Sequence, residues 1–438
     1  MQKTRVPSPP LKQVKAVPGD YVEIHLTKLI YEGVLLESSE TEKSIVLLKL
    51  DSGYNIGFNK KDILKIEVLK KAKEEEKAKF EVKKNSEKKN VALIITGGTI
   101  AARLNPKKGG VDWLTSPEDL FKFYPELFEK VNVVKVEIPF MKASEDMDFK
   151  DWQKIASVAI ELLNDGNISG IIITHGTDFL HYTSAALSFF IQNLNKPVVL
   201  TYSQRSVDRA SSDANLNLQC AGLAAISDIA EVMLVGHASS NDDYCYAMPG
   251  TKVRKLHSSR RDAFKVINSK PFAKIFPDKI ERISEWKLRN KNKAKLDSKF
   301  EDKVALVKLY PGQNADLLDY YVKKGYKGIV LELSGLGHAP TKRARNPWTL
   351  KLKEAQKKGL VICAVTQCIN GRVDPLVYSN GREILDTGVI YLDDMLAETA
   401  LVKLGWVLGH NEWNKNKKII KEKMLKNFAG ELNNRIDE

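Results

Sequence analysis

The chain contains two short strings in which threonine hydroxyls follow a run of apolar residues. The first is TGGTIA, residues 96–101, directly after VALII, and the second is THGTD, residues 174–178, directly after GIII. Glycine lets backbone N–H groups approach a ligand closely, and a hydroxyl beside a carboxylate can position an amino-acid ligand or relay a proton. We therefore expect the two strings to form a site for a polar ligand.

Other chemistries suit the two strings less well. The paired glycines would suit a nucleotide, but the chain has neither a GxGxxG nor a GK[ST] motif. His175 and His181 are close in sequence, but two histidines without a third ligand are weak evidence for a metal. We therefore expect no metal site, and we expect His175 to form structural hydrogen bonds rather than to act as a base.

The elements that would carry these strings alternate between strand and helix. From residue 91 onward, apolar segments of strand length alternate with segments of helical spacing, such as 152–163, 182–192 and 350–357. This order is typical of a parallel sheet with helices on both faces, in which ligands bind beyond the carboxyl ends of the strands. The predicted strands are residues 91–96, 170–174, 197–202, 230–235, 304–309, 328–333 and 360–365.

The segments before residue 91 have a different character. Residues 1–16 are rich in Pro and Lys and predict a flexible arm, and residues 17–69 contain short alternating segments that predict a small β-barrel of SH3 or Sm type. Residues 70–90 are dominated by Lys and Glu and predict a charged linker. After the linker we expect α/β domains at residues 91–285 and 303–438, a charged connection at 286–302 and a basic helical tail.

The composition predicts a soluble protein with an excess of positive charge. The 438 residues are 43% hydrophobic, which is ample for a large core, and their formal net charge is +14. This excess favours a polyanionic partner such as tRNA, although it also suits the solvated surface of a heat-adapted protein. The four cysteines form no CxxC pair, and no apolar run is long enough to span a bilayer. We therefore expect a cytoplasmic protein that does not bind membranes.

Together the two strings resemble the active-site motifs of the bacterial-type L-asparaginase family. Further segments resemble that family in the same order, so that the resemblance covers residues 90–410. These segments are SEDM at 144–147, GLGHAP at 335–340, TQC at 366–368 and GVI at 388–390, followed by Asp394, Met395 and Glu398. The resemblance implies an α/β fold of two asparaginase-like parallel-sheet domains, here preceded by the small barrel.

The resemblance also implies catalytic roles. Thr99 would attack the side-chain amide carbon of the substrate, and Thr177, Asp178 and Lys255 would form its companion group. A threonine hydroxyl is a weak nucleophile that needs a nearby proton acceptor, and an adjacent carboxylate can orient a lysine in such a relay. The acyl-threonine intermediate would release ammonia and then be hydrolysed by water. Lys252 lies in the same segment as Lys255 and is its rival for the catalytic role.

The same resemblance implies a set of substrate-binding residues. Ser144 and Asp178 would hold the α-carboxylate and the α-ammonium of glutamine or asparagine, and the preferred amide donor is left open. Gly98, Gly176 and Glu145 would complete the substrate site. For Ser144 a purely structural alternative is the capping of a following helix, because aspartates lie close by.

Three features depart from a plain asparaginase. The family has a mobile loop after TGGTIA that carries a tyrosine, whereas residues 103–113 here read RLNPKKGGVDW. Glu145 stands where the family commonly has glutamine, and the N-terminal barrel and linker are additional. Without the tyrosine, we expect that closure of this loop depends on something else, such as a partner.

An asparaginase-like region behind a small β-barrel resembles the D subunits of the archaeal-type glutamyl-tRNA(Gln) amidotransferases. The resemblance implies a homodimeric core that releases ammonia and forms a heterotetramer with a separate partner, the E subunit. That partner would bind Glu-tRNA(Gln) and use ATP and Mg, and no cofactor is expected in this chain. Two alternatives are a stand-alone L-asparaginase and a catalytically silent RNA- or protein-binding scaffold. Retention of Thr99, Thr177, Asp178 and a candidate lysine argues against the scaffold.

Overall fold

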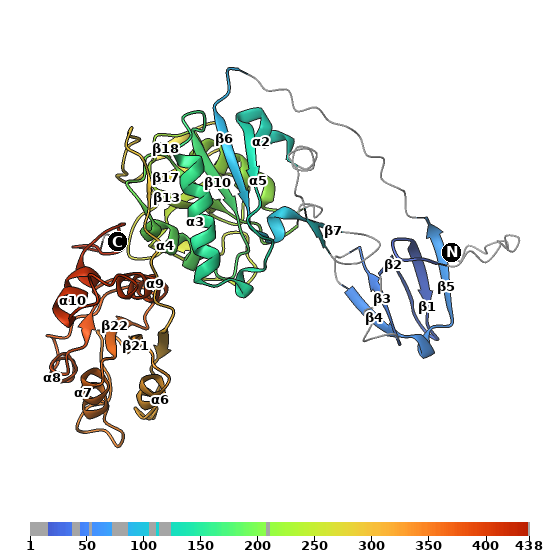
Figure 1. The fold of residues 1–438 in the computed structure, drawn as a ribbon. Helices are drawn as coiled ribbons and strands as arrows, with labels where there is room; N and C mark the ends of the chain where they lie inside the picture. The colour runs from blue at the N-terminus through green and yellow to red at the C-terminus, as the bar shows by residue number, and fades with distance from the viewer. Residues whose placement is uncertain are drawn as a thin grey trace, which may run out of the picture. The chain divides into compact units, whose positions relative to one another are not determined.

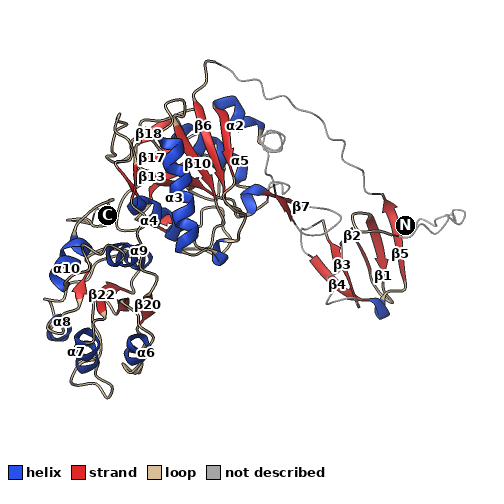
Figure 2. Ribbon diagram, viewed as in Figure 1, coloured by secondary structure: helices blue, strands red, loops and turns tan. Residues whose placement is uncertain are grey.

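The chain forms two compact units, which are described separately. A computed structural model describes residues 16–36, 44–51, 55–71, 86–104, 111–113, 124–206 and 211–436. The smaller unit comprises residues 1–79 and 102–114, and the larger unit comprises residues 80–101 and 115–438. Figures 1 and 2 show the elements of both units. Among the described residues, no helix is both long enough and apolar enough to cross a membrane.

The smaller unit contains the short strands that the sequence predicts. They form one antiparallel sheet in the order β4-β3-β2-β1-β5. Alternation in β1 points Val22 and Ile24 into a small apolar core and leaves the other three residues of the strand half-exposed. The strands are β1 (Tyr21–His25), β2 (Ile30–Leu36), β3 (Ile45–Lys49), β4 (Asn55–Asn59) and β5 (Lys65–Lys70).

A short strand pair follows the TGGTIA string. β7 (Ala102–Leu104) pairs with β8 (Val111–Trp113) in antiparallel register. Residues 103–113, the loop that lacks the tyrosine of the asparaginase family, include most of this strand pair. Residues 105–110 of the loop lie outside the described part of the chain.

The first sheet of the larger unit has eight strands in the order β18-β17-β14-β13-β12-β10-β6-β9. The five neighbouring strands β13, β12, β10, β6 and β9 run parallel to one another. β14, β17 and β18 run antiparallel to their neighbours. The bounds are β6 (Asn90–Ile95), β9 (Asn132–Glu137), β10 (Gly170–Thr174), β12 (Val198–Thr201), β13 (Val232–His237), β14 (Cys245–Pro249), β17 (Ala273–Ile275) and β18 (Ile280–Arg282).

Helices cover this sheet on both faces. α3 contacts β6, β10 and α4, and α5 contacts β10, β12, β13 and α2. α3 begins with a capping box, because the Asp148 side chain accepts from the Lys150 N–H and the Asp151 side chain accepts from the Asp148 N–H. The helices are α2 (Pro125–Lys130), α3 (Phe149–Leu163), α4 (Leu180–Phe190) and α5 (Ala214–Ala225).

The second sheet is entirely parallel, in the order β20-β21-β22-β23. α9 contacts both β21 of this sheet and α4 of the first α/β domain, so one apolar core continues through both domains. The bounds are β20 (Val304–Lys308), β21 (Gly328–Leu333), β22 (Val361–Thr366), β23 (Ile390–Tyr391), α6 (Leu317–Lys323), α7 (Thr349–Lys357), α8 (Ser379–Leu385), α9 (Ala397–Leu408) and α10 (Lys417–Leu425).

The predicted α/β architecture is confirmed, with one correction. All of the predicted strands are present, each within two residues of the predicted bounds. The expectation of a purely parallel sheet is wrong on one side of the first sheet, where β14, β17 and β18 were not predicted. β17 and β18 span three residues each, so their alternation is too short to be recognised in the sequence.

A buried ion pair fastens the C-terminal tail to α9. Lys403 and Glu431 have fully buried side chains, and the Lys403 Nζ lies 2.6 Å from the Glu431 Oε1. The same Nζ donates to the carbonyls of Met424 and Lys426, and the carboxylate accepts from the N–H groups of 428 and 429. Breaking such a pair leaves a buried charge without its counter-charge.

We expect that Glu431→Ala lowers the free energy of unfolding by about 3–5 kcal/mol, because it leaves the Lys403 ammonium buried and unpaired. Chemical denaturation of the purified chain measures this loss. Glu422→Ala is the matched control, since Glu422 is exposed and pairs with Lys423 at 3.4 Å and should change stability by less than about 1 kcal/mol. Equal losses in the two variants would contradict this account of the tail.

Candidate active site

The TGGTIA string forms a turn directly beyond the carboxyl end of β6. Thr96 is buried, and its Oγ1 donates to the carbonyl of Thr174 at 2.8 Å, which joins this turn to the end of β10. Thr99 is half-buried and opens a short 3-10 helix, η2 (Thr99–Ala101). The buried Tyr124 hydroxyl donates to the Ile100 carbonyl at 2.8 Å and so holds η2 in place. Sequence reasoning missed Tyr124, since nothing in its local pattern marks it.

Glycines allow this turn to lie against two other segments. Gly97 and Gly98 have φ of 127° and 83°, which favour glycine. A Cβ at Gly98 would lie 2.5 Å from the Gly176 nitrogen, and one at Gly97 would lie 2.3 Å from the Lys142 carbonyl oxygen. A Cβ at Gly176 would lie 3.1 Å from the Ser144 Cβ. Gly98, Gly176 and Ser144, all predicted substrate-binding residues, are thus brought together.

Lys255 lies with the two catalytic candidates of the THGTD string. Lys255 ends β15 (Val253–Lys255), and its Nζ lies 2.8 Å from both the Thr177 Oγ1 and the Asp178 Oδ1. The Lys255 side chain is 9% exposed, whereas that of Asp178 is 60% exposed. A carboxylate and a hydroxyl therefore hold the amine in a position where a proton can pass between the amine and the hydroxyl.

The rival lysine points elsewhere. The Lys252 Nζ lies 2.7 Å from the Asp394 Oδ2 and also contacts the Asp394 carbonyl. Burial lowers the pKa of Lys252, and Asp394 opposes that shift. Lys252 thus joins the two α/β domains, and Lys255 is the lysine that the structure brings to Thr177 and Asp178.

Ser144 lies beside the two turns and is not the cap of α3. Ser144 is 2% exposed and opens the 3-10 helix η3 (Ser144–Asp146). Its Oγ accepts from the Phe179 N–H at 3.3 Å and lies 3.3 Å from the Glu145 Oε2. The N-cap of α3 is Asp148, so the alternative cap role is not realised. Glu145, the other predicted residue of this segment, is exposed.

The two histidines near the site are buried. His175 is fully buried, with Nδ1 2.7 Å from the Gly176 carbonyl and Nε2 2.9 Å from the Thr183 Oγ1. Nδ1 must donate to the carbonyl, because a carbonyl oxygen can only accept, and in the neutral ring Nε2 accepts from the hydroxyl. Burial lowers the pKa of His175 to about 4 and that of His181 to about 3. These contacts fit the structural role expected for His175.

One group of possible metal ligands occurs among the described residues. Glu23, His25 and Glu67 of the smaller unit each place a ligand atom within 4.8 Å of the others. Glu67 is also paired with Lys65 at 2.8 Å, so an ordinary ion pair accounts for part of this group. The absence of a metal from the catalytic site stays a prediction.

A second ion pair near the site was not predicted. The Arg254 Nε lies 2.9 Å from the Glu398 Oε1, which joins β15 to the start of α9. Burial raises the pKa of Glu398, although Arg254 opposes that shift. Glu398 belongs to a segment that resembles the asparaginase family, but its partner could not be read from the sequence.

Comparisons with known proteins identify the family of the chain. Residues 90–288 match the family described as Asparaginase, N-terminal, and residues 303–423 match the Glutaminase/Asparaginase C-terminal domain. Residues 16–69 match the GatD N-terminal domain. The D subunit of the glutamyl-tRNA(Gln) amidotransferase of Pyrococcus furiosus is 47% identical over 432 residues, which cover 96% of each chain. This chain belongs to the family of these D subunits.

Other members of the D-subunit family and related structures extend the comparison. The D subunit of Thermococcus kodakarensis is 47% identical over 92% of this chain and 91% of its own, and that of Methanococcus maripaludis is 41% identical over 96% and 99%. The thermostable L-asparaginase from Thermococcus kodakarensis superposes with a TM-score of 0.69 at 29% identity and covers 78% of this chain and 99% of its own. L-asparaginase I from Vibrio cholerae gives 0.64 at 28% identity, over 79% and 99%.

The two lysines provide a matched pair of variants. We expect Lys255→Met to lower the rate of ammonia release by about 10²–10⁴-fold, because a positioned proton-transfer group contributes that much, and to change stability little. Lys252→Met should instead leave Asp394 without its counter-charge and lower the free energy of unfolding by about 3–5 kcal/mol. Amide hydrolysis and chemical denaturation measure the two effects, and the opposite pattern would reverse the assignment.

The lowered pKa of the buried His175 side chain predicts that the folded chain loses stability at acidic pH. Its pKa rises from about 4 in the folded chain to the ordinary 6.5 on unfolding, so the unfolded chain binds more protons between these values. Stability should therefore be intact above pH 6.5 and fall towards pH 4, by up to about 3 kcal/mol from this residue.

Denaturation curves of the parent and of His175→Asn between pH 4 and pH 7 measure this contribution. The variant should show a smaller decrease in stability as the pH falls. His257→Asn is the control because His257 is exposed, and its decrease should equal that of the parent. An unchanged pH dependence in His175→Asn would contradict the prediction.

Proposed function

We propose that this chain is the amide-hydrolysing subunit of a glutamyl-tRNA(Gln) amidotransferase and uses Thr99 as its nucleophile. The observation that carries the proposal is the position of the Lys255 Nζ, 2.8 Å from both the Thr177 Oγ1 and the Asp178 Oδ1. Thr177 and Asp178 belong to a turn that lies against the turn of Thr99. The chain is also alignable over nearly its full length with relatives that are named as D subunits of this enzyme.

The reaction has two halves. The Thr99 hydroxyl attacks the side-chain amide carbon of glutamine or asparagine and passes its proton to the group of Thr177, Lys255 and Asp178. The tetrahedral oxyanion is stabilised by backbone N–H groups of the glycine-containing turns. The proton returns to the departing ammonia, and water then hydrolyses the acyl-threonine ester to release glutamate or aspartate and free Thr99.

Substrate binding is assigned to the surrounding residues. The α-carboxylate binds at Ser144 and the α-ammonium at Asp178, which are the buried and the exposed members of the site. Gly98 and Gly176 contribute backbone to the substrate site, and Glu145 completes it. No cofactor takes part in this chain.

The partner and the assembly belong to the same proposal. A separate E subunit binds Glu-tRNA(Gln), activates its glutamate with ATP and Mg, and receives the ammonia in the cytoplasm. The core is a homodimer, and two partner subunits complete a heterotetramer. The five-stranded N-terminal sheet closes into a small SH3- or Sm-like barrel. The net charge of +14 suits work beside RNA.

A stand-alone L-asparaginase is the second candidate. Its support is that the asparaginase structures are covered almost completely by this chain, at 99% of each. In that case the N-terminal sheet would be an accessory domain, and activity would not depend on a partner.

The two candidates predict different ammonia assays. We expect the purified chain alone to release ammonia slowly from glutamine and asparagine, and release to rise strongly with the E subunit, ATP, Mg and Glu-tRNA(Gln). Loop closure that depends on the partner is the physical reason. Thr99→Ala should abolish release in the full mixture, while Thr99→Ser, which keeps a hydroxyl, should retain part of it.

The outcomes separate three functions. Brisk asparagine hydrolysis by the chain alone, unaffected by the additions, would identify a stand-alone asparaginase. If an assembly that contains the Thr99→Ala variant still converted Glu-tRNA(Gln) fully with glutamine as the amide donor, this chain would be a scaffold that supplies no ammonia.

A further inference from the structure

The strand that carries Lys255 lies outside the large sheet. β15 pairs with β16 (Phe264–Val266), and the two form a two-stranded sheet of their own. Thr177 and Asp178, in contrast, follow β10 in the middle of the eight-stranded sheet. Ladder hydrogen bonds therefore do not fix the distance between Lys255 and its two partners, and contacts of the hairpin must do so.

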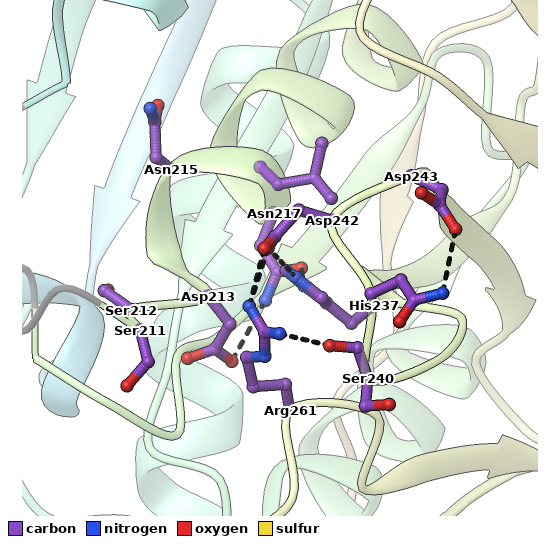
Figure 3. Close-up of polar contacts among 12 residues, drawn as sticks. Ser211, Ser212, Asp213, Asn215, Asn217, His237, Ser240, Asp242, Asp243 and Arg261 are labelled. Atoms are coloured by element: carbon purple, nitrogen blue, oxygen red, sulfur yellow. Dashed lines mark hydrogen bonds and ion pairs between the residues drawn. The ribbon is translucent and has the colours of Figure 1, made fainter.

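Arg261 anchors the loop of this hairpin. Its Nη1 lies 2.7 and 2.9 Å from the two carboxylate oxygens of Asp242, and its Nη2 donates to the Ser240 carbonyl (Figure 3). The carbonyl of Arg261 accepts from the buried Tyr202 hydroxyl at 2.9 Å. Ser240 and Asp242 follow β13 and Tyr202 follows β12, so the loop is tied to the ends of two strands of the large sheet.

Asp242 is itself held in place from inside the protein. Its side chain is 63% exposed, but the fully buried His237 places Nε2 3.0 Å from its Oδ1. The His237 Nδ1 lies 2.6 Å from the Asn217 Oδ1, while the Asn217 Nδ2 donates to the Tyr202 carbonyl at 2.9 Å. The two ring nitrogens of His237 thus connect Asn217 of α5 with Asp242. Figure 3 shows this chain of contacts from Asn217 to Arg261.

On the basis of the proposed function, we infer that Arg261 is a positioning residue for the catalytic lysine. Through Asp242 and His237 it ties the β15–β16 hairpin to α5 and β13, and so keeps the Lys255 Nζ within reach of Thr177 and Asp178. The carboxylate of the Arg261–Asp242 pair is largely exposed, and such ion pairs contribute little to the stability of the fold. We therefore expect the loss of this pair to lower the rate of ammonia release rather than the stability. A displacement of about 1 Å in a reacting group can cost about 10²-fold.

Arg260 provides a matched control in the same loop. Its guanidinium binds Asp262 at 2.9 and 3.0 Å, within the hairpin loop itself. Arg260→Ala and Arg261→Ala therefore remove the same charge from adjacent positions, and only the second removes the bonds to Ser240 and Asp242.

The experiment measures ammonia release by the complete assembly with the E subunit, ATP, Mg and Glu-tRNA(Gln). We expect Arg261→Ala to lower kcat by about 10–100-fold with KM for glutamine nearly unchanged, and Arg261→Lys to recover part of the rate. Arg260→Ala should stay close to the parent. Equal rates for Arg260→Ala and Arg261→Ala would overturn the inference.

A second comparison separates positioning from a general structural effect. Because Arg261 acts through Lys255, adding Arg261→Ala to Lys255→Met should cause no further loss of the residual rate. An undiminished loss in that background would overturn the inference while the proposed function stands. A parent assembly that releases no ammonia would instead overturn the proposed function itself.

Discussion

The close approach of two backbone turns is the constraint on which the rest of the site depends. β6 and β10 are neighbours in parallel register, so their carboxyl ends lie at the same edge of the sheet. A side chain at position 98 would meet the Gly176 nitrogen at 2.5 Å, and the Thr96 hydroxyl is already bonded to the Thr174 carbonyl. Glycine at 98 thus lets the turn of Thr99 lie directly against the turn of Thr177.

The predicted catalytic lysine comes from outside this pair of strands, and its hairpin is held from two sides. Arg254 and Lys255 are consecutive in β15, so they point to opposite faces of the hairpin. Lys255 reaches Thr177 and Asp178, whereas Arg254 reaches Glu398 at the start of α9. The second α/β domain thus supports the site through the back of the hairpin, although the predicted catalytic residues all belong to the first.

The sequence predicted what is encoded locally and missed what depends on distant contacts. The two glycine-containing strings follow long apolar runs, so both their strands and their position at the sheet edge could be predicted. Tyr124 and Arg261 carry no such pattern, because the Ile100 carbonyl and the Asp242 carboxylate that they contact lie 24 and 19 residues away. β17 and β18 were missed because three residues are too few for alternation to show.

The choice between Lys252 and Lys255 shows why geometry must be weighed before burial. Lys252 is more buried, and burial lowers its pKa, which is a frequent mark of a functional lysine. Its carboxylate partner, however, is Asp394 of the other α/β domain, and the pair bridges the two. Lys255 is the more exposed of the two, yet its amine contacts the hydroxyl of Thr177 and the carboxylate of Asp178, which follow Gly176 in the turn that lies against that of Thr99. A desolvated ammonium with one counter-charge is suited to holding domains together, whereas proton transfer requires an amine that touches the group whose proton moves.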